Sequence, residues 1–335
     1  MQSLSISEKA YEGTVMRYFK KILIPTDGCE YAKAGVLQGL RIAKFIGADP
    51  IVVIPVDEAS FFHDECECQS FEACEGIAEE VKAAGESIEL NVKVISKKGD
   101  AKKVVDKLLN KDEDINLICM GMKGNKDTKD VFLGRLHEHL IAKAKIPIIV
   151  QPYYGKAYLH KFNELKKGEI MAGVHRIRMV IAVDGSDQAD VAAWEGIQFA
   201  NQLNLGTKVI ALHVAKSLKD ANGKEKIKPE DYIKIPQRAK KMGMDMGVVV
   251  EPEVRVGTDM AHEIVKRAAE IKADILVMGS HGRTGPLARF MGNKTETVLR
   301  TVPVPVMIVP PELRRSTKDV CAEEFVDEAW EDVGK

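Results

Sequence analysis

The sequence predicts an α/β fold made of two tandem doubly wound, Rossmann-like domains, each with a five-stranded parallel sheet. Short apolar runs alternate with longer helical patterns, which is typical of a parallel sheet covered by helices on both faces. The chain has 335 residues, enough for two cores of about 150 residues each. One glycine spacing also occurs twice, as Gly121, Gly124 and Gly134 and again as Gly279, Gly282 and Gly292.

The same plan of five strands is predicted in each half. The first-half strands are expected at 21–25, 51–56, 90–96, 115–120 and 147–150, and the second-half strands at 178–183, 208–214, 248–256, 274–278 and 305–309. We therefore expect a first domain at 1–152, a linker at 153–176 where a mixed, charged stretch interrupts the alternation, and a second domain at 177–311. Residues 312–335 predict an acidic amphipathic tail, because apolar residues recur there at helical spacing among acidic ones.

Each glycine triplet follows an apolar strand and ends where a helical pattern begins. Glycine lets backbone N–H groups approach an anion closely, and a helix N-terminus adds positive partial charge, so these are the parts of a phosphate-binding site. An aspartate after a strand precedes the first glycine by 94 residues in one half (Asp27) and by 95 in the other (Asp184). Internal duplication explains this agreement far better than coincidence, and the pattern points to nucleotide binding.

The composition excludes several classes of protein. With 45% hydrophobic and 30% charged residues, the chain is neither disordered nor fibrous. A net charge of -1 gives no reason to expect nucleic acid or an anionic membrane as a partner. The first twenty residues lack the apolar core of a signal peptide, so we expect a cytoplasmic protein. Six cysteines are too few for a disulfide scaffold, so reduced thiols are expected.

One cluster concentrates possible metal or redox ligands, namely His63, Cys66, Cys68 and Cys74. Its Cys-x-Cys spacing lacks the two-residue gap of structural zinc sites, and no second ligand pair follows at the expected distance. Cys74 also falls in step with a helical apolar stripe. A solvated loop followed by a core thiol is therefore the competing interpretation, and no metal site is assigned.

Several motifs resemble one known family. Residues 277–285 read Val-Met-Gly-Ser-His-Gly-Arg-Thr-Gly, and residues 302–309 read Val-Pro-Val-Pro-Val-Met-Ile-Val. Together with Leu212-His-Val214, Val183-Asp-Gly-Ser186 and Pro25-Thr-Asp-Gly28, they are similar to the motifs of universal stress protein domains. The resemblance covers roughly residues 18–152 and 175–311, and it implies an adenine nucleotide alpha hydrolase-like fold that binds ATP without a Walker A lysine.

The resemblance also implies which residues contact the nucleotide. In the second half they are Ala182, Val183, Asp184, Val214, Met278, Gly279, Gly282, Gly292, Asn293 and Lys294. In the first half they are Pro25, Thr26, Asp27, Val56, Met120, Gly121, Gly124, Gly134 and Arg135. The aspartate would accept hydrogen bonds from the ribose, and Mg²⁺ would accompany the phosphates.

The two candidate sites depart from the family at one position. ATP-binding members have Ser or Thr after the third glycine, where this chain has Asn293 in one half and Arg135 in the other. Asparagine can still donate to a phosphate, with Lys294 adding charge. Arg135 could either clamp a phosphate or fill its place, and both interpretations stay open.

The expected function is that of a stress-response regulator that binds an adenine nucleotide in its second domain and signals by conformation to a protein partner. The family pairs its last strands between domains, which implies a homo-oligomer or an internal pseudo-dimer. No hydrolase triad is identified, so slow ATP hydrolysis is the most that is expected. Two alternatives are a nucleotide-free scaffold and a thiol or metal sensor built on the cysteine cluster.

Overall fold

The computed structural model describes residues 18–56, 71–123, 135–153, 177–203, 206–217, 228–282 and 291–313. The first-half elements are β1 (Lys21–Pro25), α2 (Glu30–Ile46), β2 (Asp49–Val56), α3 (Phe71–Glu86), β3 (Lys93–Lys98), α4 (Ala101–Lys111), β4 (Ile115–Lys123), α5 (Arg135–Lys143) and β5 (Ile148–Tyr153). The second-half elements are β6 (Arg178–Ala182), α7 (Asp187–Leu203), β7 (Lys208–Lys216), η2 (Pro229–Tyr232), α8 (Lys234–Asp245), β8 (Val250–Gly257), α9 (Met260–Glu270), β9 (Ile275–Gly279), α10 (Asn293–Thr301), β10 (Val306–Val309) and η3 (Pro311–Leu313).

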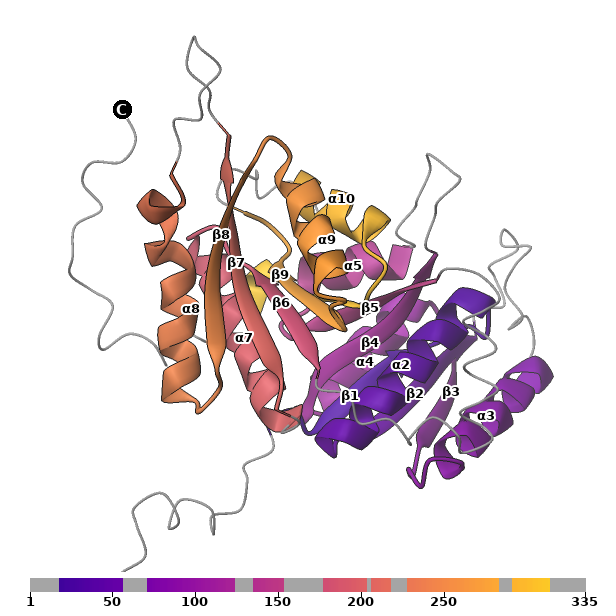
Figure 1. Cartoon of the computed structure of the whole chain (residues 1–335). Coiled ribbons are helices and arrows are strands. Elements are labelled where there is room, and N and C mark those ends of the chain that lie inside the picture. Colours follow the sequence, from indigo (N-terminus) through magenta and orange to yellow (C-terminus); the bar gives the residue numbers. More distant parts are fainter. Residues whose placement is uncertain are drawn as a thin grey trace, which may run out of the picture.

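The strands of both halves form one continuous sheet of ten strands (Figure 1). Its order is β3-β2-β1-β4-β5-β10-β9-β6-β7-β8. All pairs within a half are parallel, and β5 and β10 join the halves in an antiparallel pair. The predicted α/β architecture is confirmed, and so is the internal pairing through the last strands.

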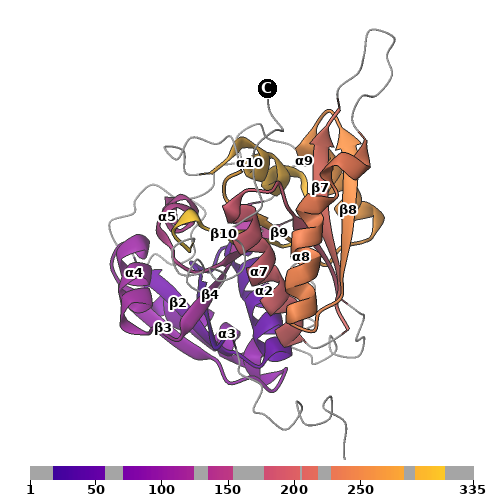
Figure 2. The same cartoon turned by 90° about the vertical axis from the view of Figure 1, so that its left-hand side faces the viewer.

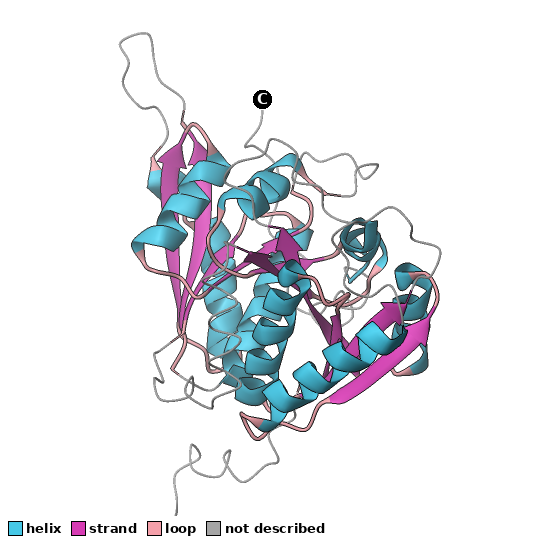
Figure 3. Cartoon of the chain, turned by 90° about the vertical axis from the view of Figure 1, so that its right-hand side faces the viewer, coloured by secondary structure: helices cyan, strands magenta, loops and turns pink. Residues whose placement is uncertain are grey.

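Both faces of the sheet are covered by helices, as Figures 2 and 3 show. One hydrophobic core lies between the sheet and α2, α3, α7 and α8, and the other lies beneath α4, α5, α9 and α10. Strands buried on both faces must be apolar at nearly every position, and β9 and β10 are buried throughout. Among the described residues, no helix is long and apolar enough to cross a membrane.

The two halves differ where their fourth strands end. Strand β9 ends at Gly279, the first glycine of its triplet, as the sequence predicts to within one residue. Strand β4 instead continues through Gly121 and Met122 to Lys123 and pairs with β5 as far as Tyr153. The expectation that this strand stops at Met120 is therefore wrong, because three further residues find partners in a longer β5.

Helix α7 of the second half holds the start of the first half. The Gln202 amide donates to the carbonyls of Phe19 (2.8 Å) and Ile46 (2.9 Å) and accepts from the Phe19 N–H (2.7 Å). The Tyr18 hydroxyl donates to Glu195 at 2.9 Å, and the Tyr18 ring packs edge-on against Trp194. Contacts between the halves therefore extend from the β5–β10 pair to this helix.

Some sequence predictions fall outside the described residues. The predicted linker lies outside them except for Tyr153, and so does the tail from residue 314 onward. The same holds for His63, Cys66, Cys68, Gly124 and Gly134.

Candidate functional site

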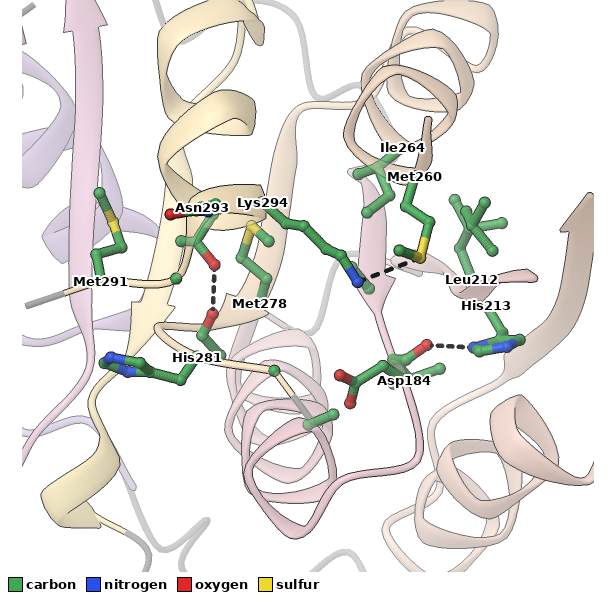
Figure 4. A pocket seen from close by; sticks show the side chains of 18 residues that line it. Asp184, Leu212, His213, Met260, Ile264, Met278, His281, Met291, Asn293 and Lys294 are labelled. Atoms are coloured by element: carbon green, nitrogen blue, oxygen red, sulfur yellow. Dashed lines mark hydrogen bonds between the residues drawn. The ribbon is translucent and has the colours of Figure 1, made fainter. Parts of the chain in front are cut away.

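A cavity of about 230 Å³ opens at the carboxyl ends of β6, β7 and β9. Strand β6 lies between β9 and β7. The direction in which the chain adds successive strands to the sheet therefore reverses at β6. Ligands of open α/β sheets bind at such a reversal, beside the carboxyl ends of the strands. Helices α9 and α10 supply the remaining walls (Figure 4).

All ten residues predicted for the second-half site line this one cavity. The structure adds residues that the prediction did not assign to the site: Ala189, Leu212, His213, Met260, Ile264, His281, Met291 and Thr295. Met260 and Ile264 are four residues apart on α9, and their side chains belong to an ordinary amphipathic stripe. The sequence of such a stripe does not distinguish a residue that lines a cavity from one that packs in the core.

Asp184 stands just after the end of β6, next to Gly282 of the glycine loop. One of its oxygens accepts from the Ser186 N–H at 3.0 Å and from the Ser186 hydroxyl at 2.6 Å. The other oxygen, Oδ2, lies only 2.7 Å from where a β-carbon would stand at position 282, so Gly282 is needed for this approach. The Ser186 hydroxyl also accepts from the Ala189 N–H and caps α7, so it serves the helix rather than acting as a nucleophile.

The glycine loop brings the start of α10 to the cavity. The Ser280 N–H donates to Val309 at 2.9 Å, and the Gly292 N–H donates back to Ser280 at 2.8 Å. Helix α10 starts directly after Gly292, which has no side chain to cap the helix. The positive end of the helix dipole therefore faces the cavity, which is the arrangement that anions bind.

Lys294 carries a positive charge across the mouth of the cavity. It is the second residue of α10, and its Nζ atom reaches the Met260 sulfur of α9 at 3.3 Å. Figure 4 shows this side chain pointing toward the side of the cavity where Asp184 stands. A thioether is a weak acceptor, so an anionic ligand would be a far better partner for the ammonium group.

The inner wall is apolar and holds one fixed histidine. Val214, Met278 and Met291 belong to the core between the sheet, α9 and α10. His213 is buried, and its Nδ1–H donates to the Val183 carbonyl at 2.8 Å. Its ring stacks on Tyr232, with centroids 5.5 Å apart and an interplanar angle of 19°. This wall can accommodate a flat, largely apolar ring.

His281 contributes to the cavity wall mainly through its backbone. Its ring points away from Asp184 (Figure 4), and its Nδ1 atom lies 3.0 Å from the Ser280 hydroxyl. Gln188 donates to the same hydroxyl at 3.0 Å and to the Val309 carbonyl at 3.1 Å. Ser280 is fully buried, so this network anchors the loop to α7 and β10.

The family model for the universal stress protein family matches residues 18–152 and 176–310. The chain belongs to the universal stress protein family. A universal stress protein of Methanocaldococcus jannaschii is 31% identical over 140 residues, covering 39% of this chain and 81% of that protein. The crystal structure of a universal stress protein from Archaeoglobus fulgidus aligns with a TM-score of 0.62 at 23% identity, covering 88% of this chain and 99% of that chain.

A further solved structure is a universal stress protein in complex with cAMP. It is 26% identical to this chain, covers 40% of it and 97% of its own length, and has a TM-score of 0.32.

In the first universal stress protein half, the predicted residues are not all brought together. Pro25 and Asp27 lie at the end of β1, as their second-half counterparts do at the end of β6, whereas Met120 lies within β4. Val56 is not the structural counterpart of Val214. Pro25 pairs with Val53 and Ala182 with Leu212, so the residue in register with Val214 is Pro55.

Because side chains alternate along a strand, this one-residue difference reverses the direction of Val56. It joins the core beneath α2 and α3, on the face opposite Met120. Thr26 is buried, with its hydroxyl accepting from the Gly28 N–H at 3.2 Å. Arg135 begins α5, and its side chain lies outside the described part of the structure.

The cysteines give no support to a metal site within the described residues. No group of three His, Cys, Asp or Glu side chains there could hold a metal ion. Cys74 is buried and disulfide-bonded, so the expectation of reduced thiols is wrong at this position. Burial raises the pKa of the Cys29 thiol to about 12, which leaves it unreactive at neutral pH.

Proposed function

We propose that this universal stress protein binds ATP or a related adenine nucleotide in the cavity of its second half. The observation that supports the proposal is the convergence of one carboxylate, one lysine, a glycine loop and an uncapped helix N-terminus on a single cavity with an apolar inner wall. An apolar pocket with a few convergent polar groups is the usual form of a small-ligand site.

Each part of the cavity would contact a different part of the nucleotide. The base would lie against Val214 and Met278, and Asp184 would accept hydrogen bonds from the ribose hydroxyls. The phosphates would meet the N–H groups of Gly282 and of the first turn of α10, and Lys294 would neutralise part of their charge. The volume of about 230 Å³ is below the usual range for whole drug-sized ligands, so we expect the terminal phosphates to project toward solvent.

The residues present are compatible with Mg²⁺ that arrives with the phosphates. Mg²⁺ keeps several waters and is held by one or two carboxylates together with phosphate oxygens, and Asp184 faces the cavity. The ion would neutralise phosphate charge. No residue is assigned to hydrolysis, and the proposed output is conformational, passed to a protein partner through the surface around the loop.

The proposal is tested on the intact chain. Freshly purified protein is denatured and the released small molecules are identified by mass spectrometry, and binding of ATP, ADP, AMP and cAMP is then measured by calorimetry. We expect an adenine nucleotide to be released or bound, and Asp184→Ala to weaken binding at least tenfold.

The matched control is Asp245→Ala, which removes an exposed aspartate at the end of α8, away from the cavity. It should bind as the wild type does. A protein that releases no nucleotide and binds none of the four would contradict the proposal and favour a nucleotide-free scaffold.

A further inference from the structure

One pair of residues occupies the same place in the two halves but differs in size. Thr295 is the third residue of α10, and its hydroxyl donates to the Gly279 carbonyl at 3.0 Å. His137 is the third residue of α5, and its Nε2–H donates to the Gly121 carbonyl at 2.8 Å. Both pairs are separated by 16 residues. The two side chains therefore start from equivalent helix positions, and each donates to the carbonyl oxygen of the equivalent strand glycine.

The larger side chain extends into the region that corresponds to the cavity. Thr295 lines the cavity of the second half and leaves it open. The imidazole of His137 lies close enough to Asp27 for that carboxylate to raise its pKa, and Asp27 is the counterpart of the cavity aspartate Asp184. The ring is therefore hydrogen-bonded to the counterpart of Gly279 and lies within electrostatic range of the counterpart of Asp184.

The backbone around His137 closes the same space further. Strand β4 continues past Gly121, and Met122, in place of Ser280, is 2% exposed. In the second half the chain turns at Ser280, which accepts from Gly292 and allows Gly282 to face Asp184. Proline replaces Val214 at the base position, since Pro55 occupies that register.

The ring of His137 offers no positive charge to a phosphate in exchange. Burial lowers the pKa of His137 to about 4, against the smaller raising effects of the Gly121 carbonyl and Asp27. At neutral pH the ring is therefore neutral, with its one proton held by the hydrogen bond to Gly121.

We propose that His137 closes the first half to nucleotides, and that the third residue of this helix decides which half of the chain is occupied. The ligand named here rests on the proposed function of the second half. The chain then binds one nucleotide, and its first half acts as a permanently closed partner domain.

The first test measures how many ATP molecules the full chain binds by equilibrium dialysis. At an ATP concentration that just saturates the wild type, we expect one equivalent for the wild type and for Asp27→Ala, and at most about half an equivalent for Asp184→Ala. If Asp184→Ala still binds one equivalent of ATP and the double variant Asp27→Ala/Asp184→Ala binds none, the proposal is overturned.

The reciprocal variant tests the role of the position itself. Thr295→His places the closing side chain in the second half, and we expect it to weaken ATP binding at least tenfold. The matched control is Thr297→His, which adds a histidine to an exposed position of the same helix. Thr295→His that binds ATP as tightly as Thr297→His would overturn the claim that this position decides occupancy.

A measurement without nucleotide separates this proposal from the proposed function. Histidine-labelled full chain is titrated by NMR, with the His137 signal assigned by its loss in His137→Gln. We expect His137 to stay neutral down to pH 5.5, even if no nucleotide binds to either half. Titration near the ordinary pH of a solvated histidine would show that the ring stands in water, and would overturn closure whether or not the second half binds ATP.

Discussion

Glu195 predicts an unusual dependence of stability on pH. This residue of α7 is fully buried between the halves, one of its oxygens accepts from Tyr18, and the other has no hydrogen-bond partner among the described residues. Burial raises the pKa of its carboxyl group from 4.5 to about 7, and the hydrogen bond from Tyr18 opposes this only in part. Tyr18 stays protonated throughout, because the same burial raises its pKa as well.

The sign and size of the effect follow from these values. The folded protein holds the Glu195 proton more tightly than the unfolded chain, so the stabilisation is complete below pH 4.5 and is lost as the pH rises through about 7. Moving the pKa from 4.5 to about 7 corresponds to about 3 kcal/mol. Glu195→Gln keeps the shape and removes the charge, so we expect its stability to exceed that of the wild type by about 1 kcal/mol at pH 5 and by about 3 kcal/mol at pH 9.

The assay is urea unfolding of both proteins between pH 5 and 9, followed by tryptophan fluorescence. Asp190, whose pKa is raised to about 6 chiefly by burial, is present in both proteins and cancels in the difference. Glu296→Gln is the control, because that carboxylate is only partly buried and is paired with Arg300. A difference between wild type and Glu195→Gln that does not change with pH would refute the reasoning.

Three further predictions concern the cavity and the contact between the halves. Gly282→Val should reduce ATP binding more than tenfold with little loss of stability, because its β-carbon would stand 2.7 Å from the Asp184 carboxylate; calorimetry and thermal unfolding check both parts. Lys294→Ala should weaken ATP binding about tenfold, since a charge-assisted contact contributes about 1.5–3 kcal/mol, and should change adenosine binding by no more than about twofold. Equal losses of affinity for both ligands would place the lysine away from the phosphates. Gln202→Ala removes three hydrogen bonds to the main chain of the first half and should cost about 2–3 kcal/mol in urea unfolding, whereas the exposed Asn201→Ala on the same helix should cost little.

The approximate positions of the strands and the fold class could be read from the sequence because the signals were local and repeated. Apolar runs fixed the strands, and the doubled spacing of aspartate and glycines fixed their equivalence. The length of β4 was missed for a physical reason. Lys123 is polar, and it extends the strand only because Tyr153 on β5 offers it a partner. Pairing between strands is a tertiary property that the pattern of one segment does not contain.

The site was predicted where one residue type is required, and missed where many would serve. Gly282 is required because the close approach to Asp184 allows no β-carbon, and Asp184 is required by the proposed nucleotide, whose ribose needs an acceptor. Met260 supplies only apolar surface, which any core-facing residue of α9 resembles. Val56 was matched wrongly to Val214 because the spacing that relates the glycine triplets was applied to the second strands as well. The second strands are shifted by one more residue, and the alternation of side chains turns that shift into the opposite face.

Helix α7 gives the two halves unequal roles. Its first turn borders the cavity through Ala189, and its middle and end hold the first half through Glu195 and Gln202. The equivalent helix of the first half, α2, has Gln38 in place of Glu195 and Phe45 in place of Gln202. The contacts that Glu195 and Gln202 make with the first half therefore have no counterpart from these two positions of α2. A rigid helix carries a displacement of its first turn to its far end, but a ligand shifts the contact only as far as it prefers one position of α7 over another. A nucleotide bound in the second half as proposed would therefore be placed to act on the first half through α7, whereas the two equivalent positions of α2, Gln38 and Phe45, do not carry the same side chains.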